Sequence, residues 1–263
     1  MVIDGKKISQ EIIAQLERER SALPPVLRLG FVMAEGSEVS ASFVRLKERI
    51  ANKLQVVVLR EPVKETRQAI RAVERLAARS EGLIVQLPLP AQIDIDAVLR
   101  AIPPSHDVDA ENPDIQDRFV RAPVAEAISE IFVRCNIAAA RKKAVVVGAG
   151  RLVGAPAATL LRDLGADVSI ITQTHGSLSE LKTADIVVLG AGEPGLVKPE
   201  MLQEGVVLID AGTTEEGGRL AGDADPRCAE VASVFTPVPG GIGPIAVAMI
   251  FKNLFTLAKT VQQ

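Results

Sequence analysis

Three residues that could take part in chemistry share one face of an expected helix. Ser40, Phe43 and Lys47 are spaced at i, i+3 and i+7, so their side chains project from the same side of a helix. An ammonium group beside an aromatic ring on a half-buried face is partly desolvated, which lowers its pKa toward the range useful for proton transfer. The alternative is a surface lysine whose aliphatic stem follows an apolar face. Lys47 is therefore a candidate catalytic residue, with both interpretations open.

Two further polar positions follow an apolar run. Gln86 lies at the carboxyl end of Gly82-Leu-Ile-Val-Gln86, where the sheets of α/β proteins place their sites, although an ordinary strand-end amide is the competing interpretation. In His106-Asp107-Val-Asp109 the two carboxylates either cap a turn or hold a polar ligand. Capping alone is the default interpretation of these two carboxylates.

A glycine-rich turn lies near the middle of the chain. Ala144-Val-Val-Val-Gly148-Ala-Gly150-Arg-Leu-Val-Gly154 reads as a buried strand, a turn and a helix start. Gly148 permits a tight bend, Gly150 lets a pyrophosphate approach backbone N–H groups, and the helix N-terminus favours negative charge. The spacing is GxGxxxG, and an ordinary strand-to-helix turn is the alternative. The context of the turn predicts a dinucleotide site.

The residues around this turn favour NADP over NAD. An NAD site usually has a carboxylate at the end of the next strand, about 20 residues on, but here that strand ends Ile171-Thr-Gln-Thr174. Arg151 lies in the turn, and its guanidinium suits a 2′-phosphate. A solvated cation at a helix start explains Arg151 equally well, so NAD remains open.

The elements that must position these residues alternate between helix and strand. This alternation predicts parallel βαβ units in two α/β domains. A polar stretch rich in Pro, Asp and Asn, from Pro103 to Pro123, reads as a functional loop or a domain crossover, with the boundary near its end. The expected helices cover 7–20, 40–53, 66–79, 94–101, 124–135, 153–164 and 245–261, and the expected strands cover 27–33, 55–59, 82–87, 144–147, 167–171, 186–190 and 206–210.

Composition excludes several function classes. The 30 basic and 33 acidic residues give a net charge of −3, too balanced for a nucleic-acid or anionic-membrane surface. Two cysteines far apart and two histidines suggest neither a metal site nor a disulfide framework. With no Tyr, a dehydrogenase that uses a Tyr-x-x-x-Lys pair is excluded.

Two features bear on where the protein acts. The uncharged stretch 231–251 is interrupted by three prolines and three glycines, which argues against a membrane span. Asp4 comes before any apolar run could form, so the start of the chain does not read as a secretory signal. We therefore expect a cytoplasmic protein that binds small molecules.

Several motifs in the same order resemble the bifunctional methylenetetrahydrofolate dehydrogenase/cyclohydrolase family, along essentially the whole chain. The most specific is Thr236-Pro-Val-Pro-Gly-Gly-Ile-Gly-Pro244. The others are Ile3-Asp-Gly-Lys-Lys-Ile-Ser9, Val85-Gln-Leu-Pro-Leu89, Asp107-Val-Asp109 and the glycine turn with Val153-Gly-Ala-Pro156.

The resemblance implies two α/β domains with substrate in the cleft between them. The folate-binding domain would comprise residues 1–121, completed by the C-terminal helix 245–263, and a Rossmann-like NAD(P)-binding domain would comprise residues 122–244. The implied activity is oxidation of 5,10-methylenetetrahydrofolate with NAD(P)⁺, followed by hydrolysis of the methenyl product to 10-formyltetrahydrofolate. A homodimer is also implied.

The resemblance also implies roles for individual residues. Lys47 would be the catalytic lysine, Gln86 the residue that tunes it, and Asp109 the anchor of the pterin ring. The substrate would further contact Ser40, Phe43, Pro237, Gly240 and Gly241. The dinucleotide would contact Gly148, Ala149, Gly150, Arg151, Gln173, Gly212, Thr213 and Gly243.

The chain departs from the family pattern at several of these positions. Phe43 stands where the family has tyrosine, and Gln173 falls where a serine often contacts the 2′-phosphate. Ala110 replaces the glycine after Asp109, and Ala246 replaces a threonine. Two alternatives therefore stay open: a dehydrogenase that acts on a related pterin, and a catalytically weak folate- or nucleotide-binding paralogue.

Overall fold

The structure is a computed structural model that describes residues 1–34, 38–115, 119–216 and 219–260, without the side chains of residues 38–43, 215, 216 and 219. Two compact units make up the chain. One comprises Gln10–Pro123 with Val247–Gln263, and the other Met1–Ser9 with Val124–Ala246. Each contains a parallel sheet with helices, so the predicted two-domain α/β fold is confirmed.

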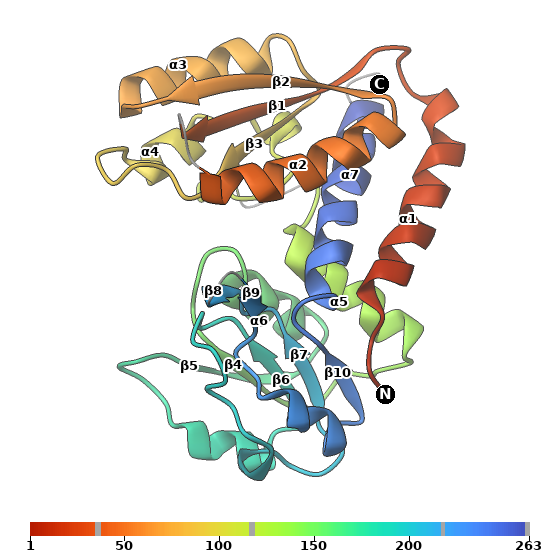
Figure 1. Cartoon of the computed structure of the whole chain (residues 1–263), viewed down its shortest axis with the longest axis vertical. Helices are drawn as coiled ribbons and strands as arrows, with labels where there is room; N and C mark the ends of the chain where they lie inside the picture. Colours follow the sequence, from red (N-terminus) through yellow and green to blue (C-terminus); the bar gives the residue numbers. More distant parts are fainter. Residues whose placement is uncertain (35–37, 116–118, 217–218, 261–263) are drawn as a thin grey trace. The chain divides into compact units, whose positions relative to one another are not determined.

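The first of these units is built on a three-stranded parallel sheet in the order β2-β1-β3 (Figure 1). The strands are β1 (Leu27–Ala34), β2 (Val56–Val63) and β3 (Gly82–Gln86), and they alternate with α2 (Glu38–Lys53), α3 (Thr66–Ala77) and α4 (Ile95–Arg100). β3 is buried on both faces, which explains its unbroken apolar sequence. Helix α3 buries Ala69, Ala72, Val73 and Leu76, the spacing of one helix face packed on the sheet.

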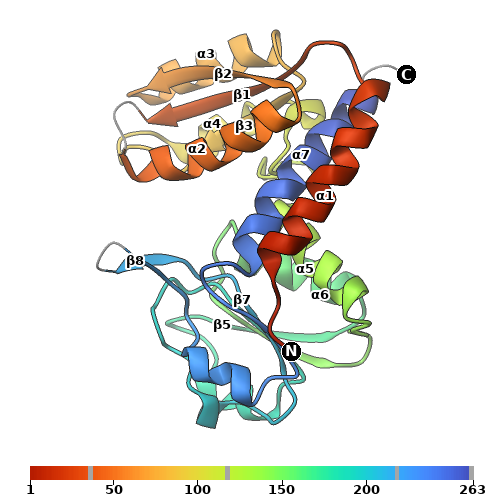
Figure 2. The ribbon, with the colours of Figure 1, turned by 45° about the vertical axis from the view of Figure 1, so that its right-hand side comes forward.

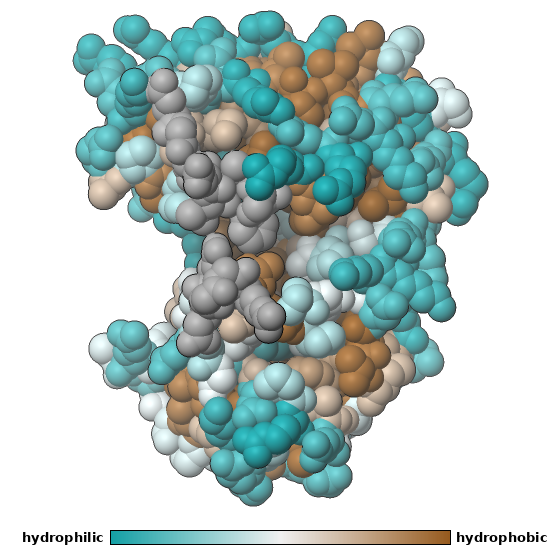
Figure 3. All heavy atoms as spheres, in the orientation of Figure 1, coloured by the Kyte–Doolittle hydropathy of each residue, from teal (hydrophilic) through white to brown (hydrophobic). Residues whose placement is uncertain are grey.

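Two long helices lie side by side, α1 (Gly5–Glu19) and α7 (Ile242–Thr260), as two views show (Figures 1 and 2), and most of each helix belongs to this unit. The Nζ of Lys259 lies 3.0 Å from a carboxylate oxygen of Glu19 near their ends. Helix α7 is long and apolar enough to cross a membrane by length and composition, yet 67% of its most apolar window is buried in the protein, which is typical of a core helix. On the face drawn in Figure 3, hydrophilic residues cover much of the surface.

The second unit contains a five-stranded parallel sheet in the order β10-β7-β6-β4-β5 (Figure 1). Its strands are β4 (Lys143–Val147), β5 (Asp167–Ile171), β6 (Ile186–Leu189), β7 (Val207–Asp210) and β10 (Val234–Thr236). The helices are α5 (Pro123–Arg134) and α6 (Gly154–Asp163), and β8 (Thr214–Glu216) pairs with β9 (Arg219–Ala221) in an antiparallel ribbon. Val145, Val187 and Leu208, from three adjacent strands, are fully buried in its core.

Several bounds differ from the expected ones, and three of these differences have local reasons. The strand expected at 55–59 runs from Val56 to Val63, because Gln55 has a φ of 53° and belongs to the turn before it. Helix α7 begins at Ile242 rather than 245, because Pro244 falls in its first turn, where the missing N–H breaks no helical hydrogen bond. The expected loop 103–123 contains a short 3-10 helix, Pro104–His106.

The N-terminal residues extend the second unit. Ile3 N donates to Phe235 O at 2.8 Å, and Phe235 N donates to Met1 O at 2.9 Å. The first residues thus pair with β10 in parallel, beyond the edge of the sheet. Gly5 N donates to Gly240 O at 2.9 Å, so the same segment also holds the loop after β10.

Candidate active site

A buried lysine and a buried glutamine meet above the three-stranded sheet. The Nζ of Lys47, from α2, donates to the Oε1 of Gln86, the last residue of β3, at 2.9 Å. Lys47 is 9% exposed and Gln86 8% exposed. The Nζ also lies 5.9 Å from the ring centroid of Phe31 on β1. The structure therefore favours the desolvated lysine of the two interpretations, with its amine held by a neutral amide and an aromatic face.

The orientation of the glutamine amide is fixed from its other side. The Nε2 of Gln86 donates to Leu87 O at 2.8 Å, which leaves the amide oxygen facing Lys47. An amide in this orientation accepts a hydrogen bond from the amine whether or not the amine carries its extra proton. Gln86 can therefore hold Lys47 through a proton transfer without fixing its charge.

The electrostatics of this cluster bring an amine and a carboxylate toward similar pKa values. Burial lowers the pKa of Lys47, and the charges of Asp109 and Glu111 oppose this shift only in part. Burial also raises the pKa of Asp109 above its usual range, with Lys47 acting against the shift and Asp107 adding to it. Such opposed shifts are typical of groups that exchange protons near neutral pH.

The loop that carries Asp109 is held by two buried asparagines. Asn112 N donates to the Oδ2 of Asp107 at 2.8 Å, and the Nδ2 of Asn112 donates to Ile102 O at 2.9 Å. The Nδ2 of Asn253, on α7, donates to both Val108 O and Arg121 O at 2.8 Å. Asp107 therefore orders the loop, which is the capping role, and Asp109 is free for another task.

The backbone of the same loop is strained at one residue. Ala110, directly after Asp109, has a φ of 54°, the left-handed region that glycine occupies at the least cost. This conformation explains why the family pattern has glycine there. In this chain the loop keeps the conformation and carries the cost of a Cβ, which is on the order of 1 kcal/mol.

The glycine turn of the second unit has the shape that the sequence predicts. Gly148, after β4, has a φ of 96°, and a Cβ there would overlap Gly190 O. A Cβ on Gly154, the first residue of α6, would overlap Gly148 O. Beside Gly150 the nearest atom to such a Cβ would be 4.0 Å away, so the turn is open there. A close-packed turn with one open glycine at a helix N-terminus fits a dinucleotide pyrophosphate.

The other candidate cofactor residues follow the carboxyl ends of β4, β5 and β7 in this unit, apart from Gly243, which lies in α7. Ala149 and Arg151 are exposed in the turn after β4, and Gln173 is exposed in the turn after β5. Gly212 and Thr213 follow β7, and Gly243 is exposed in the first turn of α7. The structure thus brings most of the cofactor set to one edge of the sheet.

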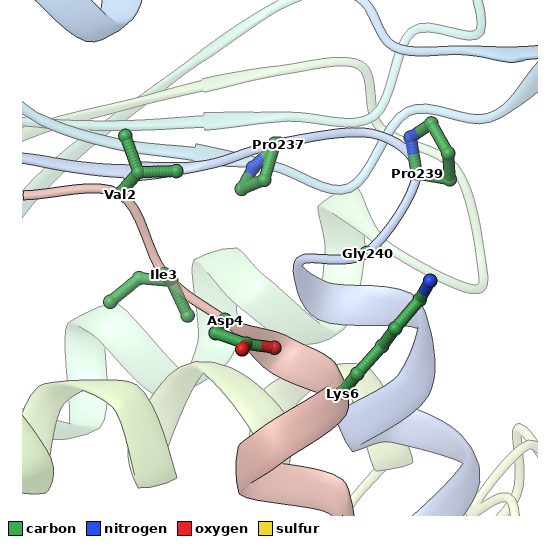
Figure 4. Close-up of a pocket in the computed structure, with 7 residues that line it drawn as sticks. All are labelled: Val2, Ile3, Asp4, Lys6, Pro237, Pro239 and Gly240. Atoms are coloured by element: carbon green, nitrogen blue, oxygen red, sulfur yellow. The ribbon is translucent and has the colours of Figure 1, made fainter.

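The candidate loop from Pro237 to Gly241 has its own supports. Gly241 N donates to Pro237 O at 2.7 Å, and the N-terminal segment holds Gly240. A pocket of about 300 Å³ lies between this loop and the N-terminal segment, and in the close-up Lys6 extends toward Pro239 (Figure 4). Its lining residues are Val2, Ile3, Asp4, Lys6, Pro237, Pro239 and Gly240.

Two of the substrate residues fall outside this description. Ser40 and Phe43 belong to α2, but their side chains lie outside the described part of the chain.

Among the described residues, no group of three or more His, Cys, Asp or Glu side chains is arranged to hold a metal ion.

Sequence reasoning missed several buried polar residues that support these sites. They include Asn112, Asn253, Asp210, Asp223 and Thr236, all of them at most 4% exposed. One signal was present for Asp210, a carboxylate that ends the apolar run Val206-Val-Leu-Ile-Asp210. No comparable signal marks Asn253, whose partners lie more than 130 positions away along the chain.

Comparison with known proteins adds two family matches that together cover most of the chain. The catalytic domain of tetrahydrofolate dehydrogenase/cyclohydrolase matches residues 3–109, and the NAD(P)-binding domain of the same family matches residues 122–262. The resemblance inferred from the motifs is therefore confirmed.

Similar proteins extend over the full length. A "Bifunctional protein FolD" from Halothermothrix orenii is 37% identical, with 96% of this chain and 95% of that protein covered. A protein of the same name from Nautilia profundicola is 34% identical, with 98% and 97% covered.

Solved structures agree in fold. The bifunctional FolD enzyme from Campylobacter jejuni superposes with a TM-score of 0.94 at 27% identity, covering 99% of both chains. The enzyme from Trypanosoma brucei, complexed with NADP cofactor and inhibitor, has a TM-score of 0.89 at 31% identity, covering 100% of this chain and 98% of that one.

Proposed function

Because the chain belongs to the tetrahydrofolate dehydrogenase/cyclohydrolase family, we propose that it carries out both reactions of that family through the residues around Lys47. It oxidises 5,10-methylenetetrahydrofolate to the 5,10-methenyl form with NADP⁺, and it hydrolyses the methenyl form to 10-formyltetrahydrofolate. The observation that carries the assignment is the buried amine of Lys47, hydrogen-bonded to Gln86 at 2.9 Å and electrostatically coupled to Asp109.

Binding and orientation are the chain's main contribution to the oxidation. NADP⁺, when bound, supplies the acceptor for the hydride that leaves the methylene carbon. We assign its pyrophosphate to the turn of Gly148, Ala149 and Gly150, with Gly212, Thr213 and Gly243 further along the same unit. We assign the 2′-phosphate to Arg151 and Gln173, because a guanidinium and an amide can both donate to phosphate oxygens.

Substrate positioning is assigned to residues of both the helix and the loops. Asp109 accepts hydrogen bonds from the pterin, Phe43 stacks on its ring and Ser40 lies on the same helix. Pro237, Gly240 and Gly241 complete the substrate contacts. These roles agree with the raised pKa of Asp109, which is about 6. A carboxyl with such a pKa is partly protonated near neutral pH, and its protonated form can also donate a hydrogen bond.

Lys47 moves protons in the hydrolysis. Water adds its oxygen to the methenyl carbon, and the neutral amine of Lys47 takes the proton that the water releases. The bond between that carbon and N5 then breaks as N5 gains a proton and the new hydroxyl loses one, which leaves the formyl group on N10. Gln86 holds the amine throughout, and the net reaction releases one proton.

The test of this function is an absorbance assay at the reduced-nicotinamide band, with NADP⁺ and NAD⁺ in parallel, followed by a hydrolysis assay on the methenyl form. Lys47→Met should lower the hydrolysis rate by at least about 100-fold, the usual contribution of a positioned proton-transfer group. Its dissociation constant for NADP⁺ should stay unchanged. Lys53→Met is the matched control, since Lys53 lies on the same helix and pairs with Glu17 on the surface.

Either of two results would contradict the proposal. One is a wild-type protein that forms no NADPH from saturating methylenetetrahydrofolate, which would favour a binding paralogue or another pterin. The other is equal hydrolysis by Lys47→Met and wild type. We further propose that residues 1–121 with 245–263 form the folate-binding domain and that 122–244 form the dinucleotide-binding domain, with the difference that Met1–Ser9 belong to the same compact unit as Val124–Ala246. We also propose that the enzyme is a cytoplasmic homodimer, and light scattering measures the mass that tests this.

A further inference from the structure

A buried carboxylate at the end of β7 organises the loops of the dinucleotide-binding unit. Asp210 is 1% exposed. Its Oδ1 accepts hydrogen bonds from Gly212 N at 3.0 Å and Asp223 N at 3.2 Å, and its Oδ2 accepts one from Ala224 N at 2.9 Å. One side chain therefore joins the loop that follows its own strand to the loop that follows β9.

A second buried carboxylate extends this network to the next strand. Asp223 is fully buried, and its two oxygens accept from Ala191 N at 2.6 Å, Gly192 N at 3.2 Å and Glu193 N at 2.8 Å. These three residues form the loop after β6. That loop starts at Gly190, whose carbonyl packs against Gly148 of the glycine turn. The network thus extends to the turn assigned to the pyrophosphate.

Two glycines make room for these carboxylates, because they have no side chain. A Cβ on Gly212 would overlap the carboxylate of Asp223, and a Cβ on Gly222 would overlap the Oδ2 of Asp210. Gly212 is also one of the residues assigned to the dinucleotide. The absence of its side chain is therefore explained by the carboxylate of Asp223, which fills the space that a Cβ would need.

A threonine joins the network to the last strand of the sheet. Asp210 N donates to the Oγ1 of Thr236 at 2.7 Å, and that hydroxyl donates to Asp210 O at 3.1 Å. Thr236 is fully buried and directly precedes Pro237. The carboxyl ends of β6, β7 and β10, which are neighbours in the sheet, are therefore connected through the residues around Asp210.

We propose that Asp210 and Asp223 are positioning residues for the dinucleotide, which hold the loops after β6 and β7 in the shape that binds it. This inference rests on the proposed function, because it takes the carboxyl edge of the sheet as the cofactor site. In an open α/β sheet, ligands bind at the carboxyl ends of the strands. Neither carboxylate is assigned a contact with the ligand, since every described bond of their oxygens goes to backbone N–H groups.

The charge of Asp210 gives this role a measurable signature. Burial raises the pKa of Asp210 to about 7; Asp223 adds to the shift, and the N–H donors, Ala224 first, oppose it. Asp223 is the other carboxyl that faces it, and the thiol of Cys228 lies nearby on the 3-10 helix Pro226–Glu230. The N–H donors favour the ionised form, so protonation of the buried carboxyl weakens their bonds. Acidification from pH 8 to pH 6 should therefore loosen these loops within the folded protein and lower dinucleotide affinity, although the same protonation favours the folded protein over the unfolded chain.

The experiment compares wild type with Asp210→Asn and Asp223→Asn by calorimetric titration with NADP⁺ and by hydrogen exchange of the cofactor-free protein. Each variant should raise the dissociation constant roughly tenfold, the cost of one or two lost charge-assisted bonds. KM for NADP⁺ should rise while kcat stays within about twofold, because the carboxylates do not touch the reacting atoms. In Asp223→Asn, the backbone N–H groups of Ala191, Gly192 and Glu193 should exchange their hydrogens faster than in wild type.

Asp185→Asn is the matched control. Asp185 also accepts a backbone bond, from Lys143 N at 2.9 Å, but it precedes β6 and so lies at the opposite edge of the sheet. Its loss should leave the dissociation constant unchanged. The affinity of Asp210→Asn should depend less on pH than that of Asp185→Asn, a comparison that cancels the titration of the 2′-phosphate itself.

Each outcome decides between the two proposals. A wild-type protein that does not bind NADP⁺ overturns the proposed function and this inference with it. A wild-type protein that binds NADP⁺, with Asp210→Asn and Asp223→Asn matching it in affinity and pH profile, overturns the inference alone. If both variants fail to fold, wild type is titrated with NAD⁺, which lacks the 2′-phosphate: weaker binding at pH 6 than at pH 8 supports the inference, and a flat profile overturns it.

Discussion

Lys47 and Gln86 form a pair in which the neutral partner is as important as the amine. The amide oxygen accepts from Lys47 at 2.9 Å without adding charge, so the burial that lowers the pKa of Lys47 is not cancelled. A carboxylate at position 86 would instead favour the charged ammonium. The chain therefore keeps the amine able to release its proton by placing a neutral acceptor beside it.

Gln86→Glu tests this argument at the scale of one residue. The new carboxylate should raise the pKa of Lys47. The pH at which the hydrolysis rate rises should therefore increase by about 1 unit or more. The measurement is the hydrolysis rate from pH 6 to pH 10, with Gln92→Glu as the control, since Gln92 is exposed and its Nε2 donates to Lys64 O at 3.0 Å. Coincident profiles for Gln86→Glu and wild type would show that the amide does not control the amine.

At the scale of elements, the start of α1 sets the position of the loop between β10 and α7. Gly5 N donates to Gly240 O, and a Cβ on Gly5 would overlap Gly241 O, with Gly240 O at only 2.6 Å. Both obstacles are backbone atoms, which cannot move aside as a flexible side chain would. The loop that carries Pro237, Gly240 and Gly241 is therefore seated on the N-terminal segment.

Gly5→Ala should displace this loop. We expect KM for the folate substrate to rise at least about fivefold and the free energy of unfolding to fall by about 1–3 kcal/mol, as for other overpacked sites. Steady-state kinetics and urea denaturation measure the two effects. The control is Gly205→Ala, where nothing lies within 4 Å, although its φ of 80° predicts a modest loss of stability without a change in KM. An unchanged KM in Gly5→Ala would contradict the seating role.

The elements that sequence alone predicted best are those with one strong periodic signal. Helix α3 and the buried strands β3, β4 and β6 were expected close to their observed bounds, because their apolar pattern reflects burial directly. The ribbon of β8 and β9 was not expected, since three-residue strands carry too little pattern. Neither was the pairing of the N-terminal residues with β10, which depends on contacts more than 230 positions apart.

The same contrast holds for the sites. Local motifs placed Lys47, Gln86 and the glycine turn, because residue type and the end of a strand are visible in sequence. The buried supports were not visible: Asn253 bonds Val108 O and Arg121 O, and Asp223 bonds the loop after β6. Their partners are backbone atoms, which have no signature in the sequence of the segment that supplies them.

At the scale of the whole molecule, each unit buries titratable groups whose pKa values move away from their values in the unfolded chain. Asp109 and Lys47 belong to one unit and Asp210 to the other. Raised carboxyl pKa values mean that the folded protein holds more protons than the unfolded chain below neutral pH. The lowered pKa of Lys47 means that it holds fewer above neutral pH. The two buried carboxyls should therefore make stability fall as pH rises toward 7, and Lys47 should make it rise again on the alkaline side.

Asp210→Asn isolates the acidic side of this dependence. The pKa of Asp210 is about 7 in the folded protein against 3.8 for an aspartate side chain in water, so wild type loses stability as pH rises through this window. Between pH 5 and pH 8 this loss is roughly 2–3 kcal/mol, at about 1.4 kcal/mol per pKa unit. Asp210→Asn cannot ionise, so its free energy of unfolding relative to wild type should increase by that amount over the same interval.

Urea denaturation at several pH values, followed by circular dichroism, measures this difference. If the two units unfold in separate transitions, the effect belongs to the transition of the unit with the five-stranded sheet, and Lys47→Met should change the other one. Asp185→Asn should differ from wild type by a constant amount from pH 5 to pH 8, because the backbone bond from Lys143 and other causes lower the pKa of that partly exposed carboxyl, which is then ionised over this range in the folded and the unfolded chain alike. If the difference in free energy of unfolding between Asp210→Asn and wild type stays constant from pH 5 to pH 8, Asp210 keeps one charge state throughout this range. The burial of Asp210 would then not control its ionisation, which would contradict this prediction.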